Sequence, residues 1–145
     1  RIIEKIDIDT IFFTYDADGY MLSSSTGSGA NLSKQTNYTT ENGNVITVIQ
    51  KNGSGTTTHT TSVDYYTDKT NKGNLSLIYE FLLDARYGKA TKNLIKQVYN
   101  SDGTNVTISE ATYDFNSNGY VEAFHVLQQP SNSYQTFNFT YNCNN

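Results

Sequence analysis

The sequence predicts a mostly β protein in which antiparallel strands follow one another as a meander. Apolar and polar residues alternate over short segments along most of the 145 residues, which is the period of strands with one buried face. Clusters of Gly with Asn or Asp separate these segments, as in β-hairpins. A single segment, residues 74–86, carries the period of an α-helix.

The composition predicts one folded domain over residues 1–145, a length that suits a single hydrophobic core. Hydrophobic residues make up only 36%, but the 12 Tyr and 7 Phe can each bury a large area. Charged residues amount to 17%, whereas disordered chains combine few aromatic residues with high net charge. We therefore expect an ordered β-rich domain.

The expected strands differ in how much of each face is apolar. Alternating residues mark segments 2–8, 11–16, 44–50, 56–66, 106–115 and 136–141. Residues 44–50 are apolar on both sides and predict burial of both faces, whereas residues 56–66 are Thr-rich and predict one face in water. Between Val106 and Phe115 the apolar parity changes at Glu110, which predicts a β-bulge there.

The helical segment carries apolar residues on one helix face, at Leu75, Ile78, Tyr79 and Leu82. Asn74 suits the N-cap position, and Gly88 suits the C-terminal stop. We expect this helix, over about residues 74–86, to pack on the sheet or to plug it. The chain then returns to a strand from about Leu94.

Short turns between the strands predict a strongly curved meander, or a partly closed barrel, of roughly eight to ten strands. A strand–turn–strand unit repeats weakly in FTYDADGYMLSSS, TNYTTENGNVITVI and ATYDFNSNGYVEAF. In these units the first strand ends at Tyr15, Tyr38 or Tyr113, and the turn contains Gly19, Gly43 or Gly119.

These hairpins, the opening Ile-x-x-Ile pair and the helix followed by KNLIKQV resemble a family of uncharacterised lipoproteins of Gram-negative gut bacteria. That family is the domain of unknown function 4595, described as porin-like in fold. More distantly, the hairpins resemble the YD-repeat unit of larger bacterial surface proteins. The resemblance covers most of the chain and implies an exported protein of the outer membrane, the cell surface or the periplasm. It implies membrane association only through a lipid anchor outside this chain, and it supplies no substrate and no catalytic residues.

The segment YDFNSNGYVEAFH begins like a calcium-binding loop, because Asp114, Asn116, Asn118 and Gly119 have the expected spacing. However, the twelfth position is His125 and not a bidentate carboxylate, and the flanking residues are typical of strands and not of helices. We therefore expect a hairpin turn and no metal site.

No sequence motif indicates a catalytic site. His59 and His125 are the only histidines, and no G-x-S-x-G motif accompanies them. The Gly-rich segments lack the Lys of a phosphate-binding loop. Carboxylates that could serve glycoside hydrolysis pair as Asp64 with Asp68, Glu80 with Asp84, and Asp114 with Glu122. None of these pairs lies in an evident aromatic cleft, so we expect no catalytic residues, no enzyme activity and no cofactor.

Several tyrosines could form a platform for sugar rings, namely Tyr65, Tyr66, Tyr87, Tyr99 and Tyr134. The interpretation favoured by their alternation is that they cover a curved sheet with their hydroxyl groups reaching water.

Charge and hydropathy exclude two classes of partner. The net charge is −4 with a pI of about 5.0 and no basic stripe, so we expect no nucleic-acid binding. No apolar run approaches the roughly 18 residues of a membrane-spanning helix. Cys143 is the only cysteine, which excludes a disulfide within the chain, and we expect it to be a small apolar residue of a terminal strand.

The function predicted on these grounds is a non-enzymatic binding or interaction module of the cell envelope, with a glycan or a protein as its ligand. Two alternatives remain open: a glycan-acting hydrolase, and a structural lipoprotein that assembles with outer-membrane partners. The sequence does not identify the residues that contact a ligand.

Overall fold

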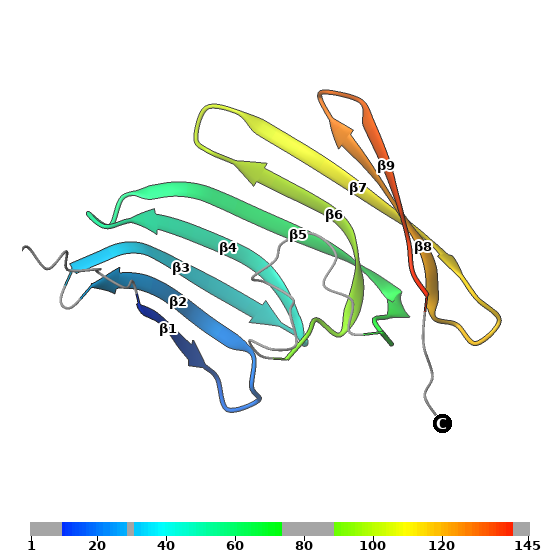
Figure 1. Ribbon diagram of the computed structural model, residues 1–145, viewed down its shortest axis with the longest axis horizontal. Helices are drawn as coiled ribbons and strands as arrows, with labels where there is room; N and C mark the ends of the chain where they lie inside the picture. Colours follow the sequence, from blue (N-terminus) through cyan, green and yellow to red (C-terminus); the bar gives the residue numbers. More distant parts are fainter. Residues whose placement is uncertain (1–9, 29–30, 74–88, 141–145) are drawn as a thin grey trace, which may run out of the picture.

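The computed structural model of the chain describes residues 10–28, 31–73 and 89–140. These residues form one nine-stranded antiparallel sheet, in which each strand pairs with its neighbours in the sequence (Figure 1). The strands are β1 (Thr10–Tyr15), β2 (Met21–Ser28), β3 (Asn31–Glu41), β4 (Asn44–Asn52), β5 (Thr57–Thr70), β6 (Asn93–Ser101), β7 (Val106–Phe115), β8 (Val121–Gln129) and β9 (Ser133–Asn138). The predicted antiparallel meander is confirmed.

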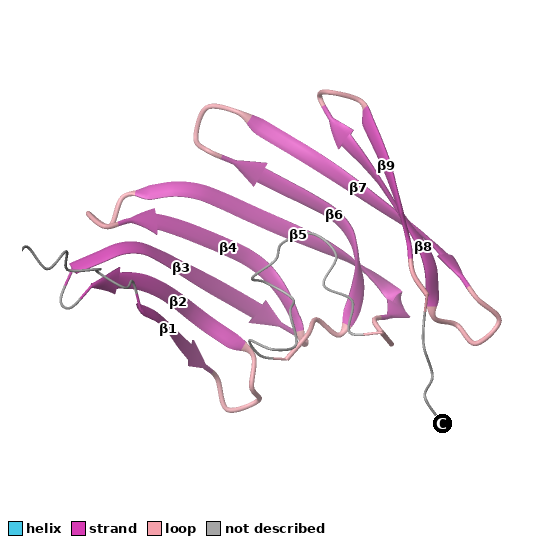
Figure 2. Cartoon of the chain, viewed as in Figure 1, coloured by secondary structure: helices cyan, strands magenta, loops and turns pink. Residues whose placement is uncertain are grey.

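Three predicted features lie outside the described residues. They are the strand over residues 2–8, the helix over about residues 74–86, and the terminal positions Tyr141 and Cys143. Within the described ranges all regular structure is β-strand, and turns and loops join the strands (Figure 2).

The sheet is open, so the alternative of a partly closed barrel is wrong. β1 and β9 are its two edges, and no ladder joins them in the described part of the chain. β8 and β9 are turned steeply relative to β1, so the two edges of the sheet do not meet (Figure 1).

One face of the sheet, which we call the inner face, carries the hydrophobic core. Its buried residues form three clusters along the sheet: Met21, Tyr38, Val45 and Val48; Val63, Ile95 and Val98; and Leu94, Ala111, Tyr113, Val121 and Phe124. In the third cluster Phe124 stacks between Tyr113, at 5.4 Å between ring centroids, and Phe137, at 5.6 Å. The opposite face, which we call the outer face, is rich in Ser, Thr, Asn and Gln.

β2, β4, β6 and β8 each contain a β-bulge close to their start. At each bulge, one residue of the strand has no partner on the preceding strand, so the pairing register shifts by one residue. The skipped residues are Leu22, Ile46, Lys96 and Glu122, and each follows a buried residue of the inner face. The bulge at Ile46 turns both Val45 and Val48 inward. Residues 44–50 therefore contribute two buried valines to one face, whereas Ile46 and Ile49 are only half-buried.

The predicted bulge at Glu110 is wrong. The pairing of β7 with β8 is unbroken from Ile108 to Asp114, and the bulge lies in β8, opposite the end of β7. The parity change in the sequence arises because Val106 points to the outer face, where it is 56% exposed. Apolar residues on both faces of β7 thus imitate the pattern of a bulge.

Tight turns at one end of the sheet are bound to the connection between β5 and β6 (Figure 1). The Lys89 N–H donates to the Gly19 carbonyl at 3.0 Å, and the Lys92 N–H donates to the Gly43 carbonyl at 2.8 Å. A Cβ at Gly43 would lie 2.8 Å from the Tyr20 hydroxyl oxygen, and its φ of +82° also favours glycine. This connection therefore holds the β1–β2 and β3–β4 turns together.

Truncating the central ring of the aromatic stack should destabilise the domain. Phe124 is 1% exposed, so Phe124→Ala removes its transfer free energy and leaves a cavity, which lowers the free energy of unfolding by about 3–5 kcal/mol. Denaturant unfolding followed by circular dichroism measures this change. The matched control is Tyr134→Ala on the exposed surface, which should change the free energy by less than about 0.5 kcal/mol. Equal effects of the two substitutions would contradict this assignment of the core.

Candidate functional site

The segment that begins like a calcium loop is a turn closed by its own side chain. The Asn116 N–H donates to the Tyr120 carbonyl at 2.9 Å, and the Gly119 N–H donates to the Asn116 carbonyl at 2.9 Å. The Asn116 Oδ1 accepts the N–H groups of Asn118 and Tyr120, both at 3.0 Å. This oxygen is therefore engaged within the turn, as in an Asx turn.

The same pattern of hydrogen bonds recurs in two other turns. The Asp16 Oδ1 accepts two N–H groups of the β1–β2 turn, and the Asn52 Oδ1 accepts two N–H groups of the β4–β5 turn. The Asp or Asn that opens each loop is thus a turn-forming residue. Among the described residues, no group of three or more His, Cys, Asp or Glu is placed to hold a metal ion.

Asp114, the first expected ligand of the calcium-like segment, belongs to a different cluster, on the outer face. The Asp114 Oδ2 lies 3.0 Å from His125 Nε2, and His125 Nδ1 lies 3.0 Å from the Thr136 Oγ1. The His125 ring also stacks on Tyr134, with 5.9 Å between centroids and 11° between planes. The register explains this cluster, because His125 pairs with Thr136 and lies diagonally across from Asp114.

A second chain of hydrogen bonds runs across β6 and β7 on the same face. The Tyr99 hydroxyl donates to the Gln97 Oε1, and the Gln97 Nε2 donates to the Glu110 Oε1 at 3.0 Å. Glu110 pairs with Leu127, which pairs with Tyr134, so the two clusters are neighbours on the sheet. We call their combined area the tyrosine surface, formed by Gln97, Tyr99, Glu110, Asp114, His125 and Tyr134.

Of the five candidate tyrosines, the four that the structure describes fall into two pairs. Tyr134 and Tyr99 are on the outer face, 64% and 37% exposed. The hydroxyl of Tyr65 donates to the Val45 carbonyl at 2.8 Å, and that of Tyr66 donates to the Ala111 carbonyl at 3.0 Å.

These two tyrosines are thus structural members of the sheet. Burial raises the pKa of Tyr65 well above its ordinary value, which keeps its hydroxyl a protonated donor. Tyr87 lies outside the described residues.

The carboxylates considered as pairs from their spacing differ in where the structure places them. Asp64 and Asp68 are exposed positions of β5, and Glu80 and Asp84 lie outside the described residues. Asp114 is on the outer face and binds His125, whereas Glu122 is the exposed bulge residue of β8. Spacing along the chain missed Gln97 and Glu110, because only the register of the strands brings them beside Tyr99 and Tyr134.

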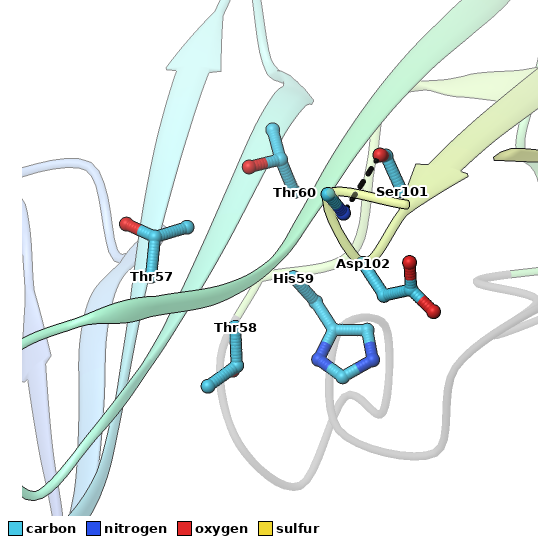
Figure 3. Close-up of a pocket in the computed structure, with 7 residues that line it drawn as sticks. Thr57, Thr58, His59, Thr60, Ser101 and Asp102 are labelled. Atoms are coloured by element: carbon cyan, nitrogen blue, oxygen red, sulfur yellow. Dashed lines mark hydrogen bonds between the residues drawn. The ribbon is translucent and has the colours of Figure 1, made fainter. Parts of the chain in front are cut away.

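The other histidine lies in a small open pocket of about 110 Å³ near two hairpin turns (Figure 3). The pocket is lined by Thr57, Thr58, His59, Thr60, Ser101, Asp102 and Gly103. The His59 ring and the Asp102 carboxylate lie beside one another, and the Gly103 N–H donates to the Ser101 Oγ at 3.1 Å. In this part of the described chain, no hydrogen bond joins His59 to a hydroxyl group, so the pocket lacks the contact that would activate a nucleophile.

The Asp102 carboxylate closes the β6–β7 turn. Its Oδ1 accepts the N–H groups of Asn105 at 2.7 Å and Thr104 at 2.9 Å, and its Oδ2 accepts the Asn105 Nδ2 at 3.1 Å. These hydrogen bonds, led by that from the Asn105 backbone, lower the pKa of Asp102 to about 2. The carboxylate is therefore ionised at neutral pH and committed to the turn.

Thr136, His125 and Asp114 have the residue types of an acid–base relay, but the Asp114 side chain is 67% exposed and remains hydrated. A relay of that kind works in a water-excluded site with donors aimed at the developing charge. Exposed rings beside acceptor and donor groups suit recognition of a ligand.

The fold is similar to that of porin-like proteins of Bacteroides. The porin-like protein from Bacteroides vulgatus has a TM-score of 0.57 and 14% identity, over 98% of this chain and 70% of that chain. The one from Bacteroides uniformis has a TM-score of 0.51 and 14% identity, over 89% of this chain and 67% of that chain. At such identity the likeness concerns the fold alone.

Two further comparisons give no relative: no family model matches the sequence, and no curated protein matches it. The described residues contain no helix that is long and apolar enough to cross a membrane.

The hydrogen bonds of the Asn116 turn predict that Asn116→Ala weakens the hairpin. The substitution leaves two N–H groups without their acceptor and should lower the free energy of unfolding by about 1–2 kcal/mol. Asn118→Ala, in the same turn, removes no such acceptor and serves as the control. Because the Asn116 oxygen is already engaged, the melting temperature should be equal in calcium and in chelator. A rise with calcium that Asn116→Ala abolishes would show that the turn binds a cation.

The lowered pKa of Asp102 predicts a pH-dependent contribution to stability. A depressed folded-state pKa stabilises the folded state above the unfolded value of 3.8, and this contribution is lost as pH falls toward about 2. Asp102→Asn, which keeps the acceptor oxygen, should melt below the unsubstituted protein at pH 7. The gap should close as the pH falls through this window. Asp18→Asn is the control, and a gap that is constant with pH would contradict the assignment.

Proposed function

We propose that this chain is a non-enzymatic binding module of the Gram-negative cell envelope and that its ligand lies on the tyrosine surface. The observation that carries the proposal is the pair of linked clusters around Tyr99 and Tyr134, which are exposed on the outer face. The envelope location is supported by the likeness in fold to porin-like proteins of Bacteroides.

We also infer membership of the domain of unknown function 4595. The Tyr-Asp and Gly-Tyr hairpins support this membership, and β1–β2 and β7–β8 form such hairpins. A lipid anchor outside this chain would then hold the domain at the membrane, exposed at the cell surface or in the periplasm. A glycan and an envelope protein are both ligands that fit this location.

A glycan is the ligand that this surface fits best. Pyranose rings present apolar C–H faces that pack on exposed aromatic rings, and the hydroxyl groups of a sugar need nearby acceptors. Tyr134 offers the ring, while Glu110 and Asp114 offer acceptors on either side of the cluster. With these two carboxylates, the surface favours neutral sugars over sugars that carry carboxylate or sulfate groups.

A glycan-acting hydrolase is the second candidate, favoured by one observation. Asp64 and Glu110 both pair with Gln97, from opposite sides, so their backbones are about 9–10 Å apart, or two strand spacings. Both side chains project from the same face, and an inverting glycosidase needs about 6.5–9.5 Å between its two carboxyl groups, which this backbone spacing allows. The two carboxylates lie on an exposed sheet face, whereas glycosidases distort the sugar in a cleft, which is why binding is preferred.

The proposal predicts that one class of neutral glycans raises the melting temperature, since a ligand of the native state alone must stabilise it. Tyr134→Ala should weaken the affinity for that glycan at least tenfold, as measured by calorimetry. Val106→Ala, at another exposed apolar residue of the outer face, is the matched control.

Three outcomes discriminate the candidates. Affinity that survives Tyr134→Ala would move the ligand away from the tyrosine surface. New reducing ends, lost in Glu110→Gln, would establish the hydrolase. A flat response to every glycan would leave an envelope protein as the ligand.

A further inference from the structure

Among the described residues, β1 is an edge strand of the sheet, and its own sequence lacks the usual protection. Its sequence is TIFFTY, and Ile11, Phe12 and Tyr15 are 48%, 54% and 43% exposed. Neither β1 nor β2 contains a charged residue or a proline, and the bulge of this hairpin lies in β2. Natural sheets usually protect their edges with charges, prolines or bulges against pairing with other chains. We infer that β1 pairs with β1 of a second copy of this chain.

The occupant of such an edge must be an extended segment, because an edge strand presents a row of free backbone donors and acceptors. A second β1 satisfies the geometry. A two-fold axis perpendicular to the sheet makes the two strands antiparallel and keeps both inner faces on the same side. An uncharged strand meets its own copy without repulsion.

The side chains of β1 determine the register. Ile11, Phe13 and Tyr15 alternate onto the inner face, where Phe13 already packs on the first core cluster. With the axis at Phe13, Ile11 lies opposite Tyr15 of the second copy, twice, and Phe13 lies opposite its own equivalent. Pairs of β-branched and aromatic residues stabilise antiparallel strands. On the outer face this register places Phe12 opposite Thr14.

The other edge is less suited to this role. β9 is also uncharged and exposed, but its rings already have partners within the chain, since Phe137 stacks on Phe124 and Tyr134 stacks on His125. Pairing β1 with β9 of a second copy about an axis parallel to the strands would make a parallel pair, because both are odd-numbered strands of a meander. Pairing β1 with β1 of the second copy gives an antiparallel pair instead.

Sedimentation equilibrium of the full chain over a range of concentrations tests the inference. We expect a monomer–dimer equilibrium whose dissociation constant rises at least tenfold in Ile11→Lys. Val106→Lys places the same charge on an exposed apolar residue of an interior strand and should leave the equilibrium unchanged. A monomer at all concentrations would overturn the inference, and so would equal weakening by both substitutions. Circular dichroism establishes that each variant is folded.

Cysteine cross-linking tests the register independently of the charged variants. In a Cys143→Ser background, Phe12→Cys and Thr14→Cys proteins are prepared separately and then mixed under mild oxidation. We expect disulfide-linked dimers in the mixture and little in either protein alone. Equal cross-linking of Phe12→Cys with itself would overturn the register, and absence of cross-linking in every sample would overturn the pairing of β1.

Discussion

The bulges near the starts of β2, β4, β6 and β8 are the constraint on which the two faces of this sheet depend. A bulge shifts the alternation of side chains by one residue, so the residues before and after it can face the same way. In β4 it directs Val45 and Val48 to one core cluster. The carbonyl groups just before the bulges of β4 and β6 accept the hydroxyls of Tyr65 and Tyr113, both at 2.8 Å. The hydroxyl groups of these two tyrosines therefore find hydrogen-bond acceptors at the positions where the bulges interrupt the pairing of the strands.

The same constraint positions the tyrosine surface. Beyond the bulge of β8, alternation carries Phe124 inward and His125 outward, and the pairing with β9 brings Thr136 and Tyr134 beside the imidazole. A slip of one residue would exchange the faces and bury the polar side chains. The core and the candidate binding surface thus share one register, which links the stability of the sheet to the integrity of the surface.

The sequence predicted where the strands and turns lie better than it predicted which side chains become neighbours in space. Alternation and the Gly turns identified most strands, and a hairpin turn after Asp114 was predicted because the twelfth position of the calcium-like segment is His125; that its Asn116 side chain closes the turn was not predicted. The assignment of a bulge to Glu110 failed because apolar Val106 faces water, which a pattern of hydropathy cannot distinguish from a change of face. The contacts of Gln97 with Tyr99 and Glu110 could not be foreseen, since they depend on the register of three strands.

The two ends of the sheet differ in what their turns touch. At one end the backbone N–H groups of Lys89 and Lys92 donate hydrogen bonds to the turns at Gly19 and Gly43, so a change in one of these loops should alter the conformation of the others. At the opposite end nothing lies within 4 Å of a Cβ built at Gly55 or Gly103, and each of these turns is closed by its own side chains. That end is suited to carrying inserted peptides or tags, and length variation among natural homologues should concentrate there.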